Sequence, residues 1–194
     1  DAVRRAAKRP RIVLASSSSV YGDGVPLPTR EDDARLFGQL SPYAMQKAQC
    51  EMALRMYWQL YGVDSVALRF FNVFGPRQLG SSPYAQAIAA WLTAYHEGQP
   101  LRSDGDGEQQ RDMCFVSNVV DACIAAAVVP GHLGAQPLNI GCGQRVSNNE
   151  ILTFLRGKLG ELNDPLPRHD ELIVARLQAL DAVGVPLLAR HQRA

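Results

Sequence analysis

The first third of the chain shows two short hydrophobic runs with a well-punctuated segment between them. The apolar run Ile12–Ala15 predicts a strand of a parallel sheet that is buried on both faces, and residues 64–69 predict a second strand. A helix is expected from Pro42 to about residue 61, because Ser41 is a typical N-cap, proline suits the first turn, and Gly62 suits the helix end. The predicted order is therefore strand, helix, strand.

Both predicted strands are followed by segments without a sustained period. Residues 17–40 and 70–77 contain glycine and proline and are expected to be loops at the carboxyl ends of the strands. Further elements are predicted as helices at 84–97, 118–129 and 147–160, strands at 113–116 and 138–140, and helical alternation over 161–194. This order predicts an open, doubly wound α/β sheet, whose ligands lie beyond the carboxyl ends of its strands.

Composition narrows the class of protein. The 194 residues include 46% hydrophobic side chains, which is enough for a sizeable core. A formal net charge of +1 gives no field that would favour nucleic acid or an anionic membrane as a partner. Neither the four cysteines nor the four histidines have the spacing of metal ligands, so we expect no metal site. Four scattered cysteines in a chain of this size are more often free thiols than disulfides, so we expect a reducing, cytoplasmic location.

Candidate chemistry lies at the start of the predicted helix and in the serine run before it. Tyr43 and Lys47 are four residues apart, so on a helix they share one face, where the ammonium favours the phenolate and makes the tyrosine a usable base. The run Ser16–Ser19 can hold a substrate alcohol. Removing hydride from a carbinol carbon requires such a base together with a hydride carrier.

These residues resemble the extended short-chain dehydrogenases/reductases, in particular the NAD-dependent epimerase/dehydratase family that acts on nucleotide sugars. The resemblance runs from residue 1 to about 160 and rests on five stretches in the same order and at similar separations, which are Ile12–Gly22, Ser41–Lys47, Leu68–Arg77, Gly105–Ala122 and Leu138–Gly143. It implies the C-terminal part of a doubly wound, parallel, Rossmann-like sheet with a smaller α/β substrate-binding lobe.

The resemblance also implies a role for individual residues. Tyr43 would be the general base, Lys47 would assist it and bind the nicotinamide ribose, and Ser17 would bind the reacting hydroxyl. Contacts to NAD would come from Tyr43, Lys47, Phe71 and Ser16. Contacts to a nucleotide-diphosphate sugar, expected to be a UDP-sugar, would come from Ser17, Ser18, Ser19, Asn72 and Arg111. A surface ion pair of Arg111 with a neighbouring aspartate is the alternative for that residue.

The serine turn narrows the expected reaction. Related 4,6-dehydratases carry an Asp-Glu pair where this chain has Ser18 and Ser19, and decarboxylating relatives carry a glutamate at the second position. Neutral hydroxyls cannot supply the additional acid and base that elimination needs. The turn therefore favours reversible oxidation at one carbon, as in a nucleotide-sugar 4-epimerase. A nucleotide-sugar reductase, a dehydratase or a uronic-acid epimerase of the same family remain as alternatives.

The resemblance divides the chain into two expected parts. Residues 1–80 would be a partial NAD-binding Rossmann domain, and residues 81–194 mainly a nucleotide-sugar-binding lobe with elements that return to the sheet and an atypical tail after about residue 160. The Gly-rich loop, first strands and ribose-binding acid of the family do not precede the serines. The chain is thus expected to start mid-fold and not to bind NAD tightly alone, so a non-catalytic remnant is a competing hypothesis. Relatives pair through helices, so the intact protein is expected to be a homodimer.

Overall fold

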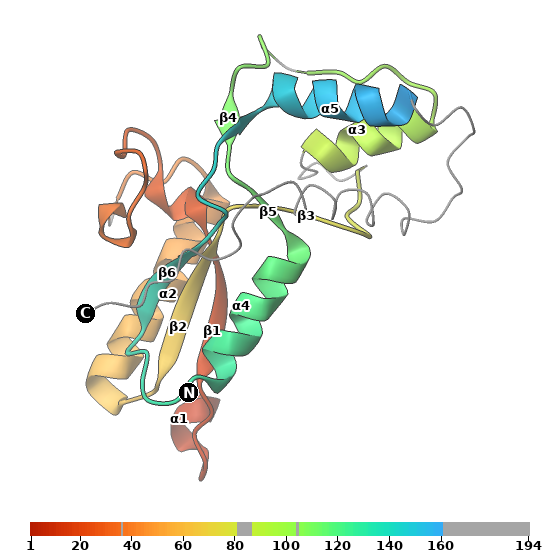
Figure 1. Ribbon diagram of the computed structural model, residues 1–194. Coiled ribbons are helices and arrows are strands. Elements are labelled where there is room, and N and C mark those ends of the chain that lie inside the picture. Colours follow the sequence, from red (N-terminus) through yellow and green to blue (C-terminus); the bar gives the residue numbers. More distant parts are fainter. Residues whose placement is uncertain (36, 81–86, 104, 161–194) are drawn as a thin grey trace. The chain divides into compact units, whose positions relative to one another are not determined.

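The computed structural model describes all residues except 36, 81–86, 104 and 161–194, so the helical alternation expected for the tail and the first residues of the helix expected at 84 lie outside it (Figure 1). The described chain forms two compact units. The first comprises Asp1–Phe71 and Ser117–Gly141, and the second takes in the described residues of Asn72–Val116 and of the chain from Cys142 onward. The first unit contains one sheet and the second contains two smaller ones, and each unit has its own helices.

The first unit is built on a parallel sheet with the strand order β1-β2-β6. Its strands are β1 (Ile12–Ser17), β2 (Ser65–Phe70) and β6 (Gln136–Ile140). Ile12 pairs with Ser65 in the register of β1 and β2. Short helical elements α1 (Ala2–Arg5), η1 (Ser18–Tyr21) and η2 (Glu31–Asp33) accompany the sheet. The prediction of parallel strands with helices between them is confirmed.

Two long helices cover opposite faces of β2 in this unit. Helix α4 (Val116–Val128) contributes Ala126 to the hydrophobic cluster of Val66 and Leu68. Helix α2 (Pro42–Tyr61) instead contacts Arg69, whose side chain lies on the other face because successive strand residues alternate. Burial on both faces explains why β2 from Ser65 to Arg69 is fully buried.

Strand β1 is less buried than its apolar sequence predicts. Among the described strands it pairs with β2, and Ile12, Val13 and Leu14 are half-buried while Ala15 is exposed. The strand also extends beyond the predicted run Ile12–Ala15 to Ser16 and Ser17, although the loop was expected to begin at Ser17. The ladder with β2 continues to the pair Ser17 and Phe70, and this pairing holds the two serines in extended conformation.

The second unit combines two small two-stranded sheets with two helices. Strand β3 (Asn72–Phe74) pairs in parallel with β5 (Met113–Phe115), and β4 (Gln110–Arg111) pairs antiparallel with β7 (Val146–Ser147). Helix α3 (Ala87–His96) and helix α5 (Asn148–Gly160) lie side by side (Figure 1), and Trp91 packs against two leucines of α5. The helix predicted at 147–160 begins with a capping box, in which Ser147 and Glu150 exchange backbone-to-side-chain hydrogen bonds of 2.7 and 3.2 Å.

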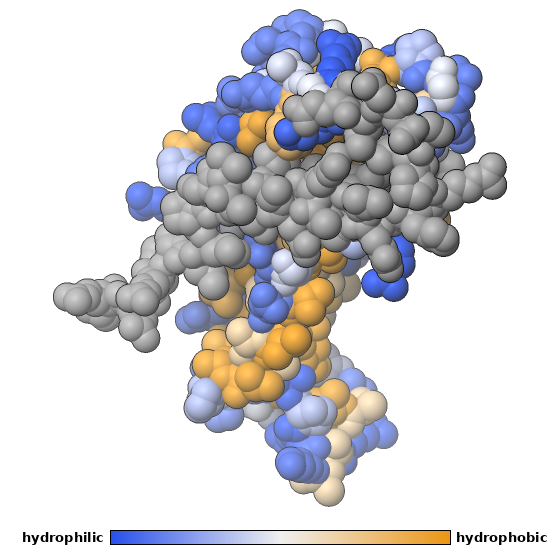
Figure 2. Space-filling model, turned by 45° about the vertical axis from the view of Figure 1, so that its right-hand side comes forward, coloured by the Kyte–Doolittle hydropathy of each residue, from blue (hydrophilic) through white to orange (hydrophobic). Residues whose placement is uncertain are grey.

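Two helices of the first unit leave apolar side chains uncovered. Helix α4 exposes Val120, Ile124 and Val128 at successive turns, and Figure 2 shows hydrophobic residues gathered in the lower part of the molecule, where Figure 1 places this helix. Helix α2 exposes Met52 and Met56. None of the four cysteines, all of which lie in the described ranges, forms a disulfide bond. Within the described ranges, no helix combines the length and apolarity needed to cross a bilayer.

Candidate active site

The start of α2 places the predicted base and its partner next to the sheet. The Ser41 hydroxyl accepts a hydrogen bond from the Ala44 amide at 3.1 Å, which fixes the first turn, and Ala44 itself is buried. Tyr43 is half exposed, at 49%. Lys47, one turn later, has its ammonium nitrogen 5.5 Å from the centre of the Tyr43 ring and donates to the Ala15 carbonyl at 2.6 Å. The two side chains thus lie together at the carboxyl end of β1.

The serine turn folds onto itself at the end of the same strand. Ser17 is the last residue of β1 and the N-cap of η1, and its hydroxyl oxygen accepts from the Ser19 amide at 3.2 Å and from the Ser19 hydroxyl at 2.9 Å. Ser18 is half-buried. The Ser16 hydroxyl is buried and donates to a carboxylate oxygen of Glu51. The turn therefore contains hydroxyls but no carboxylate of its own.

Phe71 follows β2 at the same edge of the sheet. Its amide donates to the Ile140 carbonyl at 3.1 Å, so it lies beside the end of β6, and it is half-buried. The carboxyl ends of parallel strands meet at one edge. Residues predicted from three separate stretches of sequence, the serine turn, the start of α2 and Phe71, are thus held at the carboxyl ends of β1 and β2.

Asn72 and Arg111, the two residues predicted for the sugar diphosphate, belong to the second unit. The Asn72 amide and side-chain nitrogen both donate to the Asp112 carbonyl at 3.1 Å. Arg111 is exposed in β4 and donates to the Gln110 carbonyl at 2.8 Å. The Asp112 carboxylate accepts from the amides of Cys142 and Gly143, both at 2.8 Å. Asn72 is therefore hydrogen-bonded to Asp112, the residue that follows Arg111, and this contact keeps Asn72 and Arg111 near each other.

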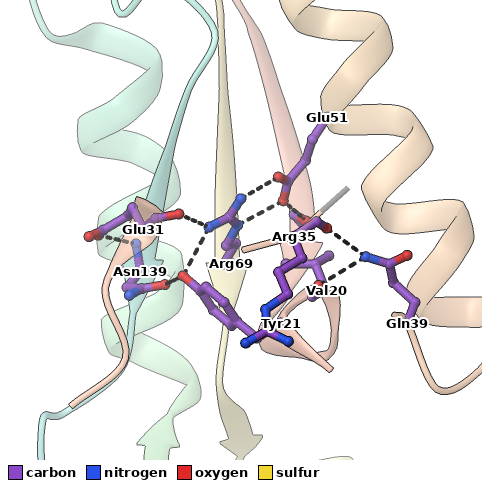
Figure 3. A network of polar contacts seen from close by, with 9 residues as sticks. Val20, Tyr21, Glu31, Arg35, Gln39, Glu51, Arg69 and Asn139 are labelled. Atoms are coloured by element: carbon purple, nitrogen blue, oxygen red, sulfur yellow. Dashed lines mark hydrogen bonds and ion pairs between the residues drawn. The ribbon is translucent and has the colours of Figure 1, made fainter. Parts of the chain in front are cut away.

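A buried polar network that the sequence did not reveal lies beside the serine turn (Figure 3). The Arg69 guanidinium binds both carboxylate oxygens of Glu51, at 2.7 and 3.1 Å, and donates to the Tyr21 hydroxyl and the Glu31 carbonyl. Tyr21 in turn donates to the side chain of Asn139 on β6. One signal in the sequence was available, since Arg69 is the one charged residue of β2 and is flanked by apolar residues.

The network determines the protonation of its members. Burial alone would lower the pKa of Arg69, but its hydrogen bonds to Glu51 and Tyr21 outweigh this and raise it. For the Tyr21 hydroxyl, burial has the opposite effect and raises the pKa, although the neighbouring Arg69 cation acts to lower it. Arg69 therefore stays a cation, and Tyr21 stays a neutral phenol that accepts from Arg69 and donates to Asn139.

A cavity of about 530 Å³ within the first unit adjoins this network. Both charged and apolar side chains of α2, of the loop around η2 and of β6 surround it, among them Glu31, Arg35, Glu51, Trp58 and Arg69. The predicted serines, Tyr43 and Lys47 do not line it. Among the described residues there is no cluster of three or more His, Cys, Asp or Glu side chains that could hold a metal ion.

The described residues fit one end of a dinucleotide. Lys47 and the half-exposed Tyr43 lie at the carboxyl ends of a parallel sheet, which is where α/β folds bind such ligands. A phenol and an ammonium are suitable donors for the hydroxyls of a ribose.

Comparison with known proteins agrees with this arrangement. The family model for the NAD dependent epimerase/dehydratase family matches residues 1–141. A UDP-glucose 4-epimerase of Mycolicibacterium smegmatis is 36% identical over 182 residues, which are 91% of this chain and 56% of the relative. The chain thus spans about half the length of the curated relatives that it matches.

Solved structures give the same result. A UDP-N-acetylglucosamine 4-epimerase from Methanobrevibacter ruminantium, solved with UDP-N-acetylmuramic acid, superposes with a TM-score of 0.72 at 37% identity, over 78% of this chain and 47% of that one. A UDP-glucuronic acid 4-epimerase from Bacillus cereus, solved with UDP-glucuronic acid and NAD, also has a TM-score of 0.72, at 29% identity over 82% and 48% of the two chains. The sheet is Rossmann-like, and the chain belongs to the NAD-dependent epimerase/dehydratase family.

Proposed function

We propose that the protein carrying this chain is an NAD-dependent nucleotide-sugar 4-epimerase, acting on a UDP-sugar. The observation that carries the proposal is the placement of Tyr43 and Lys47 beside a turn that offers only neutral hydroxyls. The M. smegmatis, M. ruminantium and B. cereus relatives are 4-epimerases of UDP-sugars, which supports the same substrate class. A dehydratase needs an additional acid and base, and Ser18 and Ser19 cannot act as either.

Each residue of the site has a role in this reaction. The Tyr43 phenolate removes the proton of the C4 hydroxyl while the Lys47 ammonium stabilises the phenolate, and Ser17 holds that hydroxyl by a hydrogen bond. NAD, when bound, would supply the hydride acceptor and donor for the oxidation and reduction at C4. The phenol then gives its proton back to the C4 oxygen, so the epimerisation consumes neither protons nor electrons overall.

The remaining predicted residues hold the reactants. Lys47, Tyr43, Phe71 and Ser16 would contact the nicotinamide end of the cofactor, with Ser16 using its backbone because its hydroxyl is bonded to Glu51. In the second unit, Asn72 and Arg111 would bind the diphosphate, for which a guanidinium fork is well suited. Ser18 and Ser19 would contact the sugar.

Oligomeric state and location are part of the same proposal. Helix α2 exposes Met45, Met52 and Met56 on one side, and such a stripe is suited to pack against a second copy of the helix. We expect the intact protein to be a homodimer in the cytoplasm. Sedimentation of the purified protein tests the first expectation, since a monomer at micromolar concentration would contradict it.

The decisive experiment uses the full-length product of the gene, supplied with NAD and with UDP-glucose, UDP-N-acetylglucosamine or UDP-glucuronate. We expect one of these to equilibrate with its C4 epimer without net formation of NADH. Tyr43→Phe removes the base and should abolish the conversion while UDP binding by calorimetry is retained. Formation of a 4-keto-6-deoxy sugar, or net reduction of NAD, would refute the assignment and favour a dehydratase or a reductase.

A second candidate is a non-catalytic chain that does not bind NAD alone. It is favoured by the share of the relatives that the chain spans, which is 56% and 44% of the length of two of them. Titration of the 194-residue chain with NAD separates the two. Micromolar binding of NAD supports catalysis by this chain. If the chain does not bind NAD but the full-length product is active, the missing contacts to NAD lie outside the chain.

A further inference from the structure

The buried ion pair of Arg69 and Glu51 is connected to the serine turn from both sides. The side chains are 5% and 14% exposed, and the guanidinium holds the carboxylate with two parallel hydrogen bonds. Such a fork fixes the relative orientation of its two partners as well as their separation. Because an uncompensated charge would be costly at this depth, each partner depends on the other staying in place.

On one side of the turn, the pair fastens α2 to β1. Glu51 lies one helical turn beyond Lys47 and accepts a hydrogen bond from the Ser16 hydroxyl, while Lys47 donates to the carbonyl of the preceding residue, Ala15. Two bonds one turn apart on the helix thus reach two consecutive residues of the strand. Together they restrict both the sliding and the rotation of α2 at the end of β1.

On the other side, the same guanidinium holds the end of the serine turn. Arg69 donates to the Tyr21 hydroxyl at 2.9 Å and to the Glu31 carbonyl at 2.7 Å, and the Tyr21 hydroxyl donates to Asn139 (Figure 3). The Arg69 guanidinium carbon also lies 4.8 Å from the centre of the Tyr21 ring. The residues between Ser16 and Tyr21 are therefore held at both ends by one ion pair.

We propose that Glu51 and Arg69 are positioning residues, which set the serine turn and the first turns of α2 in the geometry that the reaction needs. They touch neither substrate nor cofactor in this scheme, and they act through Ser16, Tyr21 and the register of α2. Their relevance to catalysis rests on the proposed function, but the structural part of the proposal does not.

The structure offers a matched control. Arg11 and Asp64 form an ion pair at 2.6 Å with side chains 10% and 13% exposed, again between the elements around β1 and β2, but at the amino ends of these strands. Breaking it should cost a comparable amount of stability without disturbing the serine turn. Asp64→Asn thus separates an effect of position from an effect of lost stability.

The first test is hydrogen–deuterium exchange of the peptide covering residues 16–22, without substrate or NAD. We expect Glu51→Gln to accelerate its exchange by about tenfold or more, and Ser16→Ala, which leaves the ion pair intact, by a smaller factor. Asp64→Asn should leave the peptide unchanged. Equal acceleration by Asp64→Asn, or none in Glu51→Gln, would overturn the proposal whether or not the protein is an epimerase.

The second test is kinetic and uses the full-length protein. In Glu51→Gln we expect kcat to fall by about tenfold or more with KM for the UDP-sugar changed less than about twofold, because misplacement of the turn affects the transition state rather than binding. Arg69→Lys keeps the charge but loses the fork and should behave in the same way. A kcat equal to that of Asp64→Asn in both variants would contradict a positioning role.

Discussion

Asp64 provides a quantitative prediction for the stability of the first unit. One carboxylate oxygen binds Arg11 at 2.6 Å, and the other accepts from the Leu133 and Gly134 amides at 2.9 and 3.1 Å. Asp64→Asn replaces one of these acceptors by a donor and leaves the guanidinium without its counter-charge. Arg11 keeps its backbone carbonyl acceptors, among them Ala126, so the loss should be about 2 to 3 kcal/mol rather than the full cost of an isolated buried charge.

The same carboxylate makes this loss dependent on pH. Burial alone would raise the pKa of Asp64, but the hydrogen bonds from Arg11, Gly134 and Leu133 outweigh it and lower the pKa from its ordinary value of 3.8. A carboxyl group with a lowered pKa in the folded state stabilises the protein above the unfolded value and loses this contribution as the pH falls through the folded value. The difference between wild type and Asp64→Asn should therefore be full at pH 7 and shrink below pH 3.8.

Urea unfolding followed by tryptophan fluorescence measures both effects. Trp58 on α2 lies beside Gly134 and reports on the first unit, and a Trp91→Phe background removes the signal of the second. The titration is run at pH 7 and at successively lower pH for wild type and variant. A difference below about 0.5 kcal/mol at pH 7, the size typical of a surface substitution, would refute the reasoning, as would a difference that grows in acid.

Three further substitutions can be measured in the same assay. Gly22→Ala places a Cβ against the Gly38 carbonyl oxygen, at a residue with a φ of +66°, and should cost at least about 2 kcal/mol of stability. Gly24 has a similar φ but open space around it, so Gly24→Ala should cost only about 1 kcal/mol. Equal losses in the two variants would contradict the steric argument. Ser41→Ala removes the N-cap of α2 and should cost about 1 kcal/mol, which Ser41→Asp should restore. Leu68→Ala, at a side chain only 1% exposed, should cost about 3 kcal/mol, and an unchanged midpoint would place that residue outside the core.

Local chemistry determined the elements that the sequence predicted best. Helix α2 begins and ends as expected because its cap residues act within the helix itself, through the Ser41 hydroxyl and the left-handed conformation of Gly62. The capping box of α5 is local in the same sense. The spacing of Tyr43 and Lys47 likewise fixed that they share one face, since four residues make about one helical turn.

Tertiary structure alone decided how these elements are used. The apolar run in β1 predicted a strand but could not identify its partner, because the pairing with β2 joins segments that are far apart in the sequence. Nor could the sequence place Ser16 and Ser17 in the strand, since only the ladder with β2 extends them. Short-range patterns contain no information on pairing between distant segments.

The network around Arg69 illustrates the same limit at the site. Its members Tyr21, Glu51, Arg69 and Asn139 are separated by as many as 118 positions along the chain, so no local pattern relates them. Only the packing of α2 and β6 around β2 brings their polar groups within hydrogen-bond distance. The sequence by itself determined which groups could do the chemistry, whereas the fold decided which buried charges hold them in place, because desolvated ion pairs form only where tertiary packing excludes water.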